Sequence, residues 1–505
     1  MPLPPDKSNG KVITLVPQLY AQWRAECLGL PALHETGPLR APSEHLLQQV
    51  WLHQRLRHEA LWTLDGQPVA ILHPGFLNRE AGPDFHHAIV QLGESPALVG
   101  DIEIDLRPEG WRQHQHADNP AYRDVRLHVV WEPGGAATVT LPTLPLHTAL
   151  DAPLPELQHW LAGGAETDLP PAQVGACAPA LRALPARPLL ELLAQAAWVR
   201  FERKAAELEA RARQSGWRQA LREGLFAALG YKHNVWPMRR LAGLLPRLLP
   251  LPEAPAPAAL ALQARLLGVG NLLPAELTRA QPETDSYLRR VWDLWWREAD
   301  GFTDAILPRS MWRFHGLRPA NHPQRRLALA THWLVEPDWE GRLEAWLTTD
   351  LPPGVAARTL ADRLQAPPDD FWSWHWTLRS PRLARPQPLL GLPRATDLAI
   401  NVLLPWLWVR ARAGGNQVLR RRAQQRFEAW PAGQDNAVLR LARQRLLGGE
   451  RLPQPHTAAT QQGLLQLVQD FCHCSNALCQ QCPLPERVQT LVPGDAKPRE
   501  AAEPC

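Results

Sequence analysis

The sequence predicts an α+β protein with an N-terminal mixed-sheet domain, a mainly α-helical domain and a small cysteine knuckle. Alternating apolar residues indicate several strands within residues 43–132, and helical periodicity dominates residues 189–447. Four of the seven cysteines crowd into Cys472–Cys482. The 505 residues are enough for about two to four domains. A content of 45% apolar and 21% charged residues is typical of globular proteins.

Shifts in composition and periodicity divide the chain into six predicted segments. They are a Pro-rich N-terminal segment (1–42), the mixed-sheet domain (43–150), a linker rich in Pro, Ala and Gly (151–185), the helical domain (186–460), the knuckle (461–490) and a flexible tail (491–505). Frequent prolines in the helical domain predict short helices. We find no repeat period of about 20 to 50 residues, so a solenoid is not expected.

The first domain begins with a helix and continues with strands. Ser43 is a typical N-cap for a helix over 44–55, where apolar residues recur with helical spacing. A hairpin is predicted over 61–72, with its turn at Asp65-Gly66. Alternation predicts three further strands, at 88–92, 98–106 and 125–131. The polar stretch 111–122 between the last two is a short helix or an ordered loop.

Charge and cysteine usage give no bulk argument for a nucleic-acid or membrane partner. The net charge is only +4. The most apolar run, Leu398–Val409, is shorter than the roughly 20 residues of a membrane span. The N-terminus lacks the features of a signal peptide, and the cysteines do not form a secreted disulfide framework. We therefore expect a cytoplasmic protein without a membrane partner. The sequence lacks the motifs of serine hydrolases, P-loop NTPases and zincins.

Acidic residues gather near two neighbouring predicted strands of the first domain. Asp84 follows Pro83 just before an apolar strand. In the next strand, Asp101, Glu103 and Asp105 alternate with apolar residues and therefore share one face. A row of carboxylates is unfavourable unless solvent, arginines or a divalent cation compensates its charge. Mg²⁺ prefers carboxylate and phosphate oxygens as ligands.

This order of helix, Pro-Asp strand, acidic strand, connection and strand resembles the PD-(D/E)xK phosphodiesterase superfamily, which has a restriction-endonuclease-like fold. The resemblance implies that Asp84 and Glu103 hold Mg²⁺ and that Glu44, on the opening helix, is an additional ligand. Asp105 stands where that superfamily has the lysine that orients the attacking water. The nearest cation, Arg107, would steady a phosphate but does not lose its proton near neutral pH. Another group would have to move the proton, or no base acts at all.

Histidines follow the acidic strand in the polar stretch. His114 and His116 have the H-x-H spacing that can bind zinc or a similar ion through neutral imidazoles. Alternatively, His116 supplies the proton transfer for which the related superfamily uses lysine. A plainer interpretation makes both of them polar loop residues and makes His128, beside Val129, a hydrogen-bonded core histidine.

The most specific local pattern is the cysteine knuckle. Its four thiols belong to Cys472, Cys474, Cys479 and Cys482. Tetrathiolate sites suit Zn²⁺ or an iron–sulfur cluster. The spacing Cys472-x6-Cys479-x2-Cys482 resembles the iron–sulfur loop of endonuclease III-type and adenine DNA glycosylases, whose fourth cysteine would fall at Val488 and is therefore missing. Cys474, His473 or the distant Cys505 would substitute, or the site is incomplete.

Two stretches with arginines are candidate nucleic-acid contacts. Residues 410–451 hold ten arginines against three acidic residues, a local net charge of +7. This run includes three consecutive arginines, Arg420, Arg421 and Arg422. Such a run binds a phosphate backbone with little sequence preference, or is a solvated helix face. Arg318 and Asn321, in the proline-stiffened stretch 312–323, fix a loop by hydrogen bonds or bind an anion.

Several of these motifs together resemble a bacterial family known as domain of unknown function 2851. The motifs are Gly82-Pro83-Asp84-Phe85, the strand 100–106, the His114/His116 loop, Leu127–Val130, Leu266-Leu267-Gly268 with Asn271-Leu272-Leu273, Arg318–Asn321 with Pro323, and the knuckle. That family carries no established activity, so the functional expectation rests on the residues. We expect a metal-dependent phosphodiesterase acting on DNA or RNA. The alternative is a non-catalytic scaffold that binds nucleic acid or protein.

Overall fold

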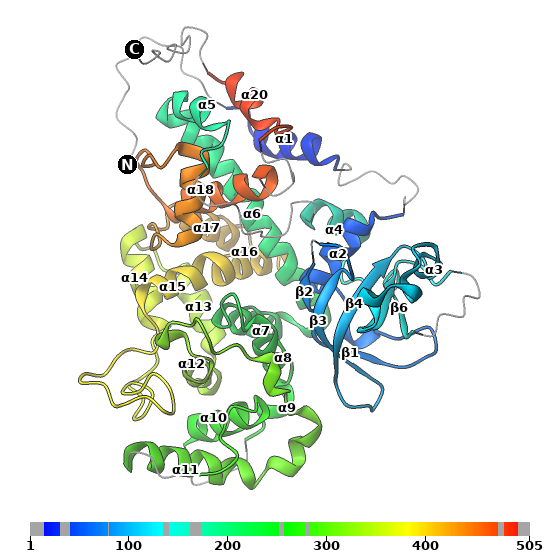
Figure 1. Cartoon of the computed structure of the whole chain (residues 1–505). Coiled ribbons are helices and arrows are strands. Elements are labelled where there is room, and N and C mark those ends of the chain that lie inside the picture. The colour runs from blue at the N-terminus through cyan, green and yellow to red at the C-terminus, as the bar shows by residue number, and fades with distance from the viewer. Residues whose placement is uncertain are drawn as a thin grey trace, which may run out of the picture. The chain divides into compact units, whose positions relative to one another are not determined.

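The computed structural model of the chain describes eight stretches of sequence (Figure 1). They are residues 15–30, 41–78, 80–134, 141–161, 173–251, 257–277, 282–472 and 479–492. Two compact units are formed. The terminal unit combines Met1–Glu35, Ala162–Arg203 and Glu428–Cys505, and the central unit combines Thr36–Leu161 with Lys204–Phe427. Much of the predicted N-terminal segment and most of the predicted tail lie outside the described residues, and the predicted segment boundaries stay predictions.

The central unit contains a mixed six-stranded sheet, drawn in blue and cyan in Figure 1. Its strands are β1 (Val69–His73), β2 (Phe76–Leu77), β3 (Phe85–Leu92), β4 (Leu98–Asp105), β5 (Val125–Val130) and β6 (Thr143–Pro145). They are ordered β1-β3-β4-β5-β6, and β2 also pairs with β3. Strand β3 is antiparallel to β1 and β4, whereas β4, β5 and β6 are parallel. The predicted mixed α/β character is confirmed.

The predicted strands are confirmed at β3, β4 and β5, but the hairpin is incomplete. Its second arm is β1, whereas its first arm pairs only through a bridge between Trp62 and Pro68. The stretch 111–122 folds as α3 (Gly110–Gln113) followed by two 3₁₀ turns. This segment connects the parallel strands β4 and β5, as such a pair requires.

One face of the sheet is buried under helices. Helix α2 (Glu44–His53) begins where predicted, because the Ser43 side chain accepts a hydrogen bond from the Leu46 backbone. Helix α4 (Leu154–Leu161) contributes leucines to the same core, which includes Ile102 and Ile104 of β4. Because strand side chains alternate, the acids of β4 must point to the opposite face.

The rest of the central unit is helical. Its helices are α7 (Trp217–Leu229), α8 (Val235–Gly243), α9 (Leu245–Leu248), α10 (Ala258–Val269), α11 (Pro282–Trp296), α12 (Pro323–Val335), α13 (Trp339–Thr348), α14 (Pro353–Arg363), α15 (Leu392–Leu398), α16 (Leu404–Ala413) and α17 (Gln417–Glu428). Several begin at a proline, which is favourable in a first turn. Trp346, Trp372 and Trp406 are fully buried and fill the core of this part, whereas Trp296 is 53% exposed.

The terminal unit joins both ends of the chain. Its helices are α1 (Leu19–Leu28), α5 (Ala178–Ala183), the first part of α6 (Ala186–Ser215), α18 (Ala437–Leu447), α19 (Ala458–Leu467) and α20 (Leu484–Gln489). Buried Asp470 accepts hydrogen bonds from Tyr20 Oη at 2.6 Å and from Arg24 Nε at 3.2 Å. This carboxylate therefore ties α1 to the C-terminal part of the unit. Of the predicted knuckle, Cys474 lies outside the described residues.

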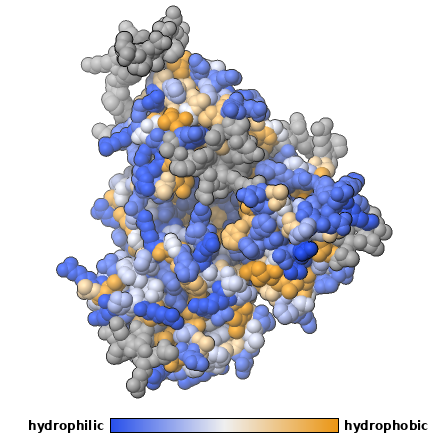
Figure 2. All heavy atoms as spheres, in the orientation of Figure 1, coloured by the Kyte–Doolittle hydropathy of each residue, from blue (hydrophilic) through white to orange (hydrophobic). Residues whose placement is uncertain are grey.

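The outer face of the protein is mainly polar where it can be viewed. Figure 2 shows hydrophilic residues over most of this face, with hydrophobic residues scattered among them. No helix within the described stretches is both long and apolar enough to cross a membrane.

Candidate functional site

Asp84 and Glu103 meet where β3 begins beside β4. The Asp84 carboxylate accepts hydrogen bonds from Gln48 Nε2 at 2.7 Å and from the Ile104 backbone N–H at 2.9 Å. The Asp84 backbone N–H donates to Glu103 Oε2 at 3.1 Å. The two acids predicted to act together are therefore adjacent. Helix α2 contributes Gln48 because that residue lies one turn after exposed Glu44.

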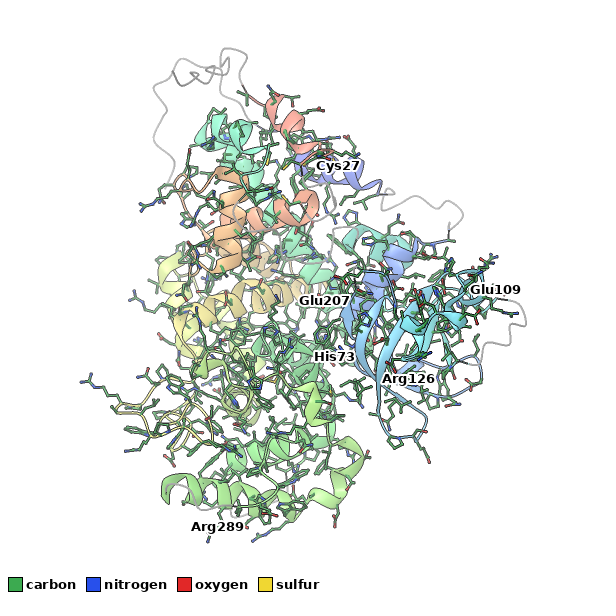
Figure 3. The ribbon with its side chains drawn as sticks, in the orientation of Figure 1. Cys27, His73, Glu109, Arg126, Glu207 and Arg289 are labelled. Carbon is green, nitrogen blue, oxygen red and sulfur yellow. The ribbon has the colours of Figure 1, made fainter. Side chains whose placement is uncertain are left out.

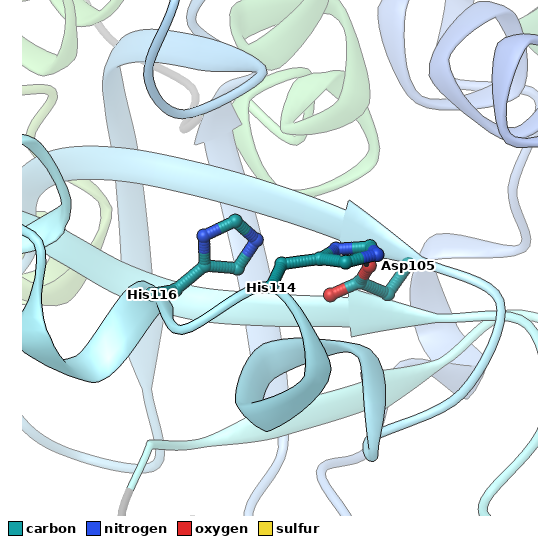
Figure 4. Close-up of side chains that lie close together, drawn as sticks. All are labelled: Asp105, His114 and His116. Carbon is teal, nitrogen blue, oxygen red and sulfur yellow. Dashed lines mark ion pairs between the residues drawn. The ribbon is translucent and has the colours of Figure 1, made fainter.

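Asp105 is surrounded by histidines at the end of β4 (Figure 4). Its buried carboxylate lies 2.9 Å from His128 Nε2, on the adjacent parallel strand, and 3.4 Å from His114 Nδ1. Potential ligand atoms of Asp105, His114 and His116 all lie within 4.8 Å of one another. Asp105, which stands where the PD-(D/E)xK superfamily has a lysine, is thus an acid with imidazole neighbours. A carboxylate and two imidazoles can bind a metal ion.

His116 is the least satisfied side chain of this group. It is 7% exposed, and its Nε2 lies 3.1 Å from Glu103 Oε1. Even so, neither of its ring nitrogens makes a hydrogen bond of acceptable geometry within the described residues. The ring stacks on Tyr122, with centroids 3.9 Å apart, and packs against Trp111. Buried polar atoms without partners are rare, so this imidazole is well suited to bind a ligand.

Burial and mutual repulsion disfavour the charged forms of the acids. Burial, followed by the charges of Asp84 and Asp105, raises the pKa of Glu103 to about 9. Burial also raises the pKa of Asp84 to about 6, although hydrogen bonds from Ile104 and Gln48 oppose the change. Without a cation, Glu103 therefore retains its proton near neutral pH.

The same environment shifts the pKa values of Tyr122 and His116. Burial and then the negative charges of Glu103 and Asp84 raise the pKa of Tyr122 to about 12. Burial lowers the pKa of His116, although Asp105 opposes that change. At neutral pH, Tyr122 is a hydrogen-bond donor and His116 is a neutral imidazole.

Glu103→Gln should stabilise the metal-free protein at high pH. The folded-state pKa of about 9 lies above the ordinary 4.5, so the free energy of unfolding falls as pH rises between these values. Removing the charge should raise it by several kcal/mol at pH 9 and by less than about 1 kcal/mol at pH 5. Thermal unfolding with chelator at both pH values measures this. Asp101→Asn is the control, because Asp101 is already paired with His86 at 3.0 Å. An equal increase in the free energy of unfolding at pH 5 and pH 9 would contradict the raised pKa of Glu103.

The two remaining predicted residues of the first domain, Glu44 and Arg107, are exposed to solvent. Exposed Glu44 is close enough to raise the pKa values of Asp84 and Glu103. The side chain of Arg107 is 69% exposed and lies 3.9 Å from a carboxylate oxygen of Glu132. Its proposed contact with phosphate stays a prediction.

Sequence reasoning did not assign Gln48, Tyr122 or Trp111 to the site. A signal for Gln48 was its spacing of four residues from Glu44 on one helix. Tyr122 and Trp111 bracket the predicted polar stretch, but their packing on His116 depends on how that stretch folds back over β4.

The predicted arginine sites have mixed surroundings. Arg422 donates to the Thr348 carbonyl, and Arg420 lies 5.5 Å from the ring centroid of Trp408. Arg421 and Arg318 are exposed. Binding of nucleic acid by these four arginines stays a prediction.

A cavity of about 470 Å³ in the central unit contains none of the predicted site residues. Its charged lining includes Glu207, labelled in Figure 3. The charges are largely paired with one another: Arg55 with Asp151, Arg211 with Glu223, and Arg239 with Glu207, each at 2.8 Å. Paired charges support packing of the cavity walls and offer less to a ligand than the acid–histidine cluster does.

Comparison with known proteins identifies the family. The family model described as "Protein of unknown function (DUF2851)" matches residues 44–436, which cover the sheet, the acid–histidine cluster and most of the helical region. No curated protein and no solved structure matches the chain. The residues that make up the candidate site therefore all lie in the matched region, and the chain belongs to the DUF2851 family.

Proposed function

We propose that the protein is a metal-dependent phosphodiesterase acting on nucleic acid, with a restriction-endonuclease-like sheet domain. The observation that carries the proposal is buried His116, whose ring nitrogens lack hydrogen bonds beside the carboxylates of Glu103 and Asp105. A cation would compensate the repulsion of the acids and use the free imidazole nitrogen as a ligand. Asp84 directly before β3 and the acids on β4, followed by a crossover to parallel β5, support the proposed fold.

The donor set fits a divalent cation. Asp84, Glu103 and Asp105 would supply oxygens, and His114 and His116 would supply nitrogens. The carboxylates alone predict Mg²⁺, but imidazole ligands favour Mn²⁺ or Zn²⁺ over Mg²⁺. When bound, such an ion polarises a phosphoryl oxygen and makes a water molecule more acidic.

Side chains of the site would orient the ligands and transfer the proton. Gln48 and the Ile104 N–H orient the Asp84 carboxylate. Neutral His116 would either bind the cation or, if His114 alone supplies the nitrogen ligand, accept a proton, which Arg107 cannot do. Asp105 cannot replace a lysine as a positive charge, but it holds the imidazoles of His114 and His128 in place.

A second candidate is a non-catalytic scaffold that binds nucleic acid or protein. Asp105 at the position of the superfamily's lysine favours this alternative, because no other described residue supplies that positive charge within the acid cluster. For either function we propose the cytoplasm as the compartment, since the five described cysteines are all free thiols.

A cleavage assay tests the proposal. Single-stranded DNA, duplex DNA and RNA are incubated with the intact protein and Mg²⁺, Mn²⁺ or Zn²⁺, with chelator as the blank. We expect metal-dependent cleavage that falls at least about 100-fold in Asp84→Asn, because the variant loses a charged ligand. Asp101→Asn is the matched control: this acid lies on the same strand face but accepts a hydrogen bond from the His87 N–H at 3.1 Å. Equal background cleavage by wild type and Asp84→Asn would remove the catalytic proposal, and binding without cleavage would favour the scaffold.

A further inference from the structure

A buried cysteine far from the knuckle in sequence lies beside it in the terminal unit. Cys177 directly precedes α5 and is 4% exposed. The backbone N–H of its neighbour Ala176 donates a hydrogen bond to Cys479 Sγ at 3.4 Å. The start of α5 is therefore in contact with the second half of the knuckle.

All three described thiols of the knuckle lie near Cys177. Burial raises the pKa of Cys177 to about 12, and Cys472, Cys482 and Cys479 each raise it further. Within the knuckle, the Cys482 backbone N–H donates to the Cys479 carbonyl at 3.4 Å. Thiols from two distant parts of the sequence therefore lie in one neighbourhood, in which Cys177 is buried and Cys472, Cys479 and Cys482 are partly exposed.

Arg445 of α18 lies against the same thiols. It is 1% exposed, its Nη2 lies 3.7 Å from Cys479 Sγ, and it also forms a hydrogen bond with the Cys472 side chain. Its carbonyl accepts a hydrogen bond from the Gly175 N–H at 2.7 Å, which fixes the chain just before Cys177. No carboxylate forms an ion pair with Arg445 in the described part of the chain. Burial of a guanidinium charge is costly, and thiolates beside Arg445 would compensate that charge.

We propose that Cys177, Cys472, Cys479 and Cys482 bind an iron–sulfur cluster or a zinc ion through four thiolates, with Cys177 as the fourth ligand. Each thiol releases its proton on binding, and the resulting negative charge is partly balanced by Arg445. Cys177 would thereby supply the fourth ligand, which the sequence of the knuckle alone does not identify.

The spacing of the sulfur atoms favours the larger cofactor. Among the described residues, no three of these sulfurs lie within 4.8 Å of one another. A tetrahedral zinc ion, with Zn–S bonds of about 2.3 Å, would require sulfurs separated by about 3.8 Å. An iron–sulfur cluster holds its thiolates on different iron atoms and therefore farther apart. Zinc would require the four sulfurs to move closer together.

Cys27 provides a matched control. It lies on α1 in the same unit (Figure 3), and its charge contributes to raising the pKa of Cys482. Its own surroundings are the charges of Arg487 and Glu26 rather than the other thiols. Cys474 and Cys505 lie outside the described residues, so their variants test competing assignments.

The test uses the intact protein, purified without oxygen. Iron, sulfide and zinc are measured, together with visible absorbance, in wild type, Cys177→Ser and Cys27→Ser. We expect one centre per wild-type chain and the same in Cys27→Ser. In Cys177→Ser the content should fall at least about tenfold. Iron with sulfide identifies the cluster, and zinc alone identifies the ion. Wild type with neither would overturn the proposal. So would full retention in Cys177→Ser, or an equal loss in Cys474→Ser or Cys505→Ser.

A second measurement on wild type avoids the risk that a variant misfolds. Cysteines are alkylated before and after removal of the metal, and the labelled positions are found by mass spectrometry. We expect Cys177 to become reactive together with Cys472, Cys479 and Cys482, and Cys27 to react equally in both states. If removal of the metal made the knuckle cysteines reactive but left the reactivity of Cys177 unchanged, Cys177 would not be a ligand. The acid–histidine cluster belongs to the central unit, so Asp84→Asn should retain this centre and separates failure of one proposal from failure of the other.

Discussion

Asp105→Ala is expected to lower the affinity of the central unit for Mn²⁺ by at least about 100-fold. The substitution removes a ligand oxygen and also releases His114 and His128, which lie 3.4 and 2.9 Å from the Asp105 carboxylate. Since a second-sphere partner alone is worth about 10- to 100-fold in affinity, loss of a ligand that also orients imidazoles should exceed that range.

Isothermal titration of the intact protein with Mn²⁺ measures this change. Mn²⁺ is chosen because it prefers carboxylates and imidazoles to thiolates, so the cysteine group of the terminal unit contributes little to the signal. Asp105→Asn keeps the shape of the side chain and should lose most of the affinity through its charge. Asp101→Asn should bind as wild type does, because that acid is already paired with His86. An unchanged affinity in Asp105→Ala would remove the proposed metal site.

Arg325→Ala is expected to lower the free energy of unfolding by about 3 to 5 kcal/mol. Arg325 of α12 is fully buried and donates hydrogen bonds to four backbone carbonyls, those of Trp372, His375, Gln387 and Pro388. It also lies 4.7 Å from the ring centroid of Trp376. These carbonyls belong to the irregular stretch 364–391 between α14 and α15, which has few backbone hydrogen bonds of its own. One guanidinium therefore holds much of this stretch against the helices.

Chemical denaturation measures the loss, and hydrogen exchange locates it. Faster exchange should concentrate in residues 364–391. Arg325→Lys should be nearly as harmful as alanine, because an ammonium cannot reach four carbonyls from one planar fork. Arg318→Ala, an exposed arginine seven positions earlier, should stay within about 0.5 kcal/mol of wild type. A similar, small effect of both alanine substitutions would show that the carbonyl contacts contribute little.

Local patterns predicted the framework of the sheet domain. The Ser43 cap, the apolar spacing of α2 and the alternation in β3, β4 and β5 are short-range features, and the structure contains all of them. Alternation also predicted that Glu103 and Asp105 share a face, because a strand allows only two side-chain directions. The prediction of a strand at 61–64 was wrong, because this arm pairs with the second one at a single bridge and the Leu64 N–H donates to the Thr143 carbonyl instead.

The partners of the site residues could not be predicted in the same way. That His116 lies between Glu103 and Tyr122 depends on the path of a segment made of short helical turns. Buried Arg325 and Arg445 run against the usual preference of arginine for the surface, so composition pointed away from them. Cys177 looked isolated, since no pattern in a sequence relates it to thiols near the other end of the chain.

The threading of the terminal unit has a consequence for biosynthesis. Its α1 is synthesised before the central unit, whereas the π-helical turn Val468–Cys472 that holds Asp470 is synthesised after it. The central unit, whose last helix ends at Glu428, can complete its fold while the final part is still being synthesised. The terminal unit has to wait with unpaired apolar surface, because its pairings span most of the polypeptide and such long-range closure is slow. A nascent chain stalled or cleaved before residue 470 would therefore carry a finished sheet domain attached to an unassembled partner, a form that chaperones and proteases would recognise.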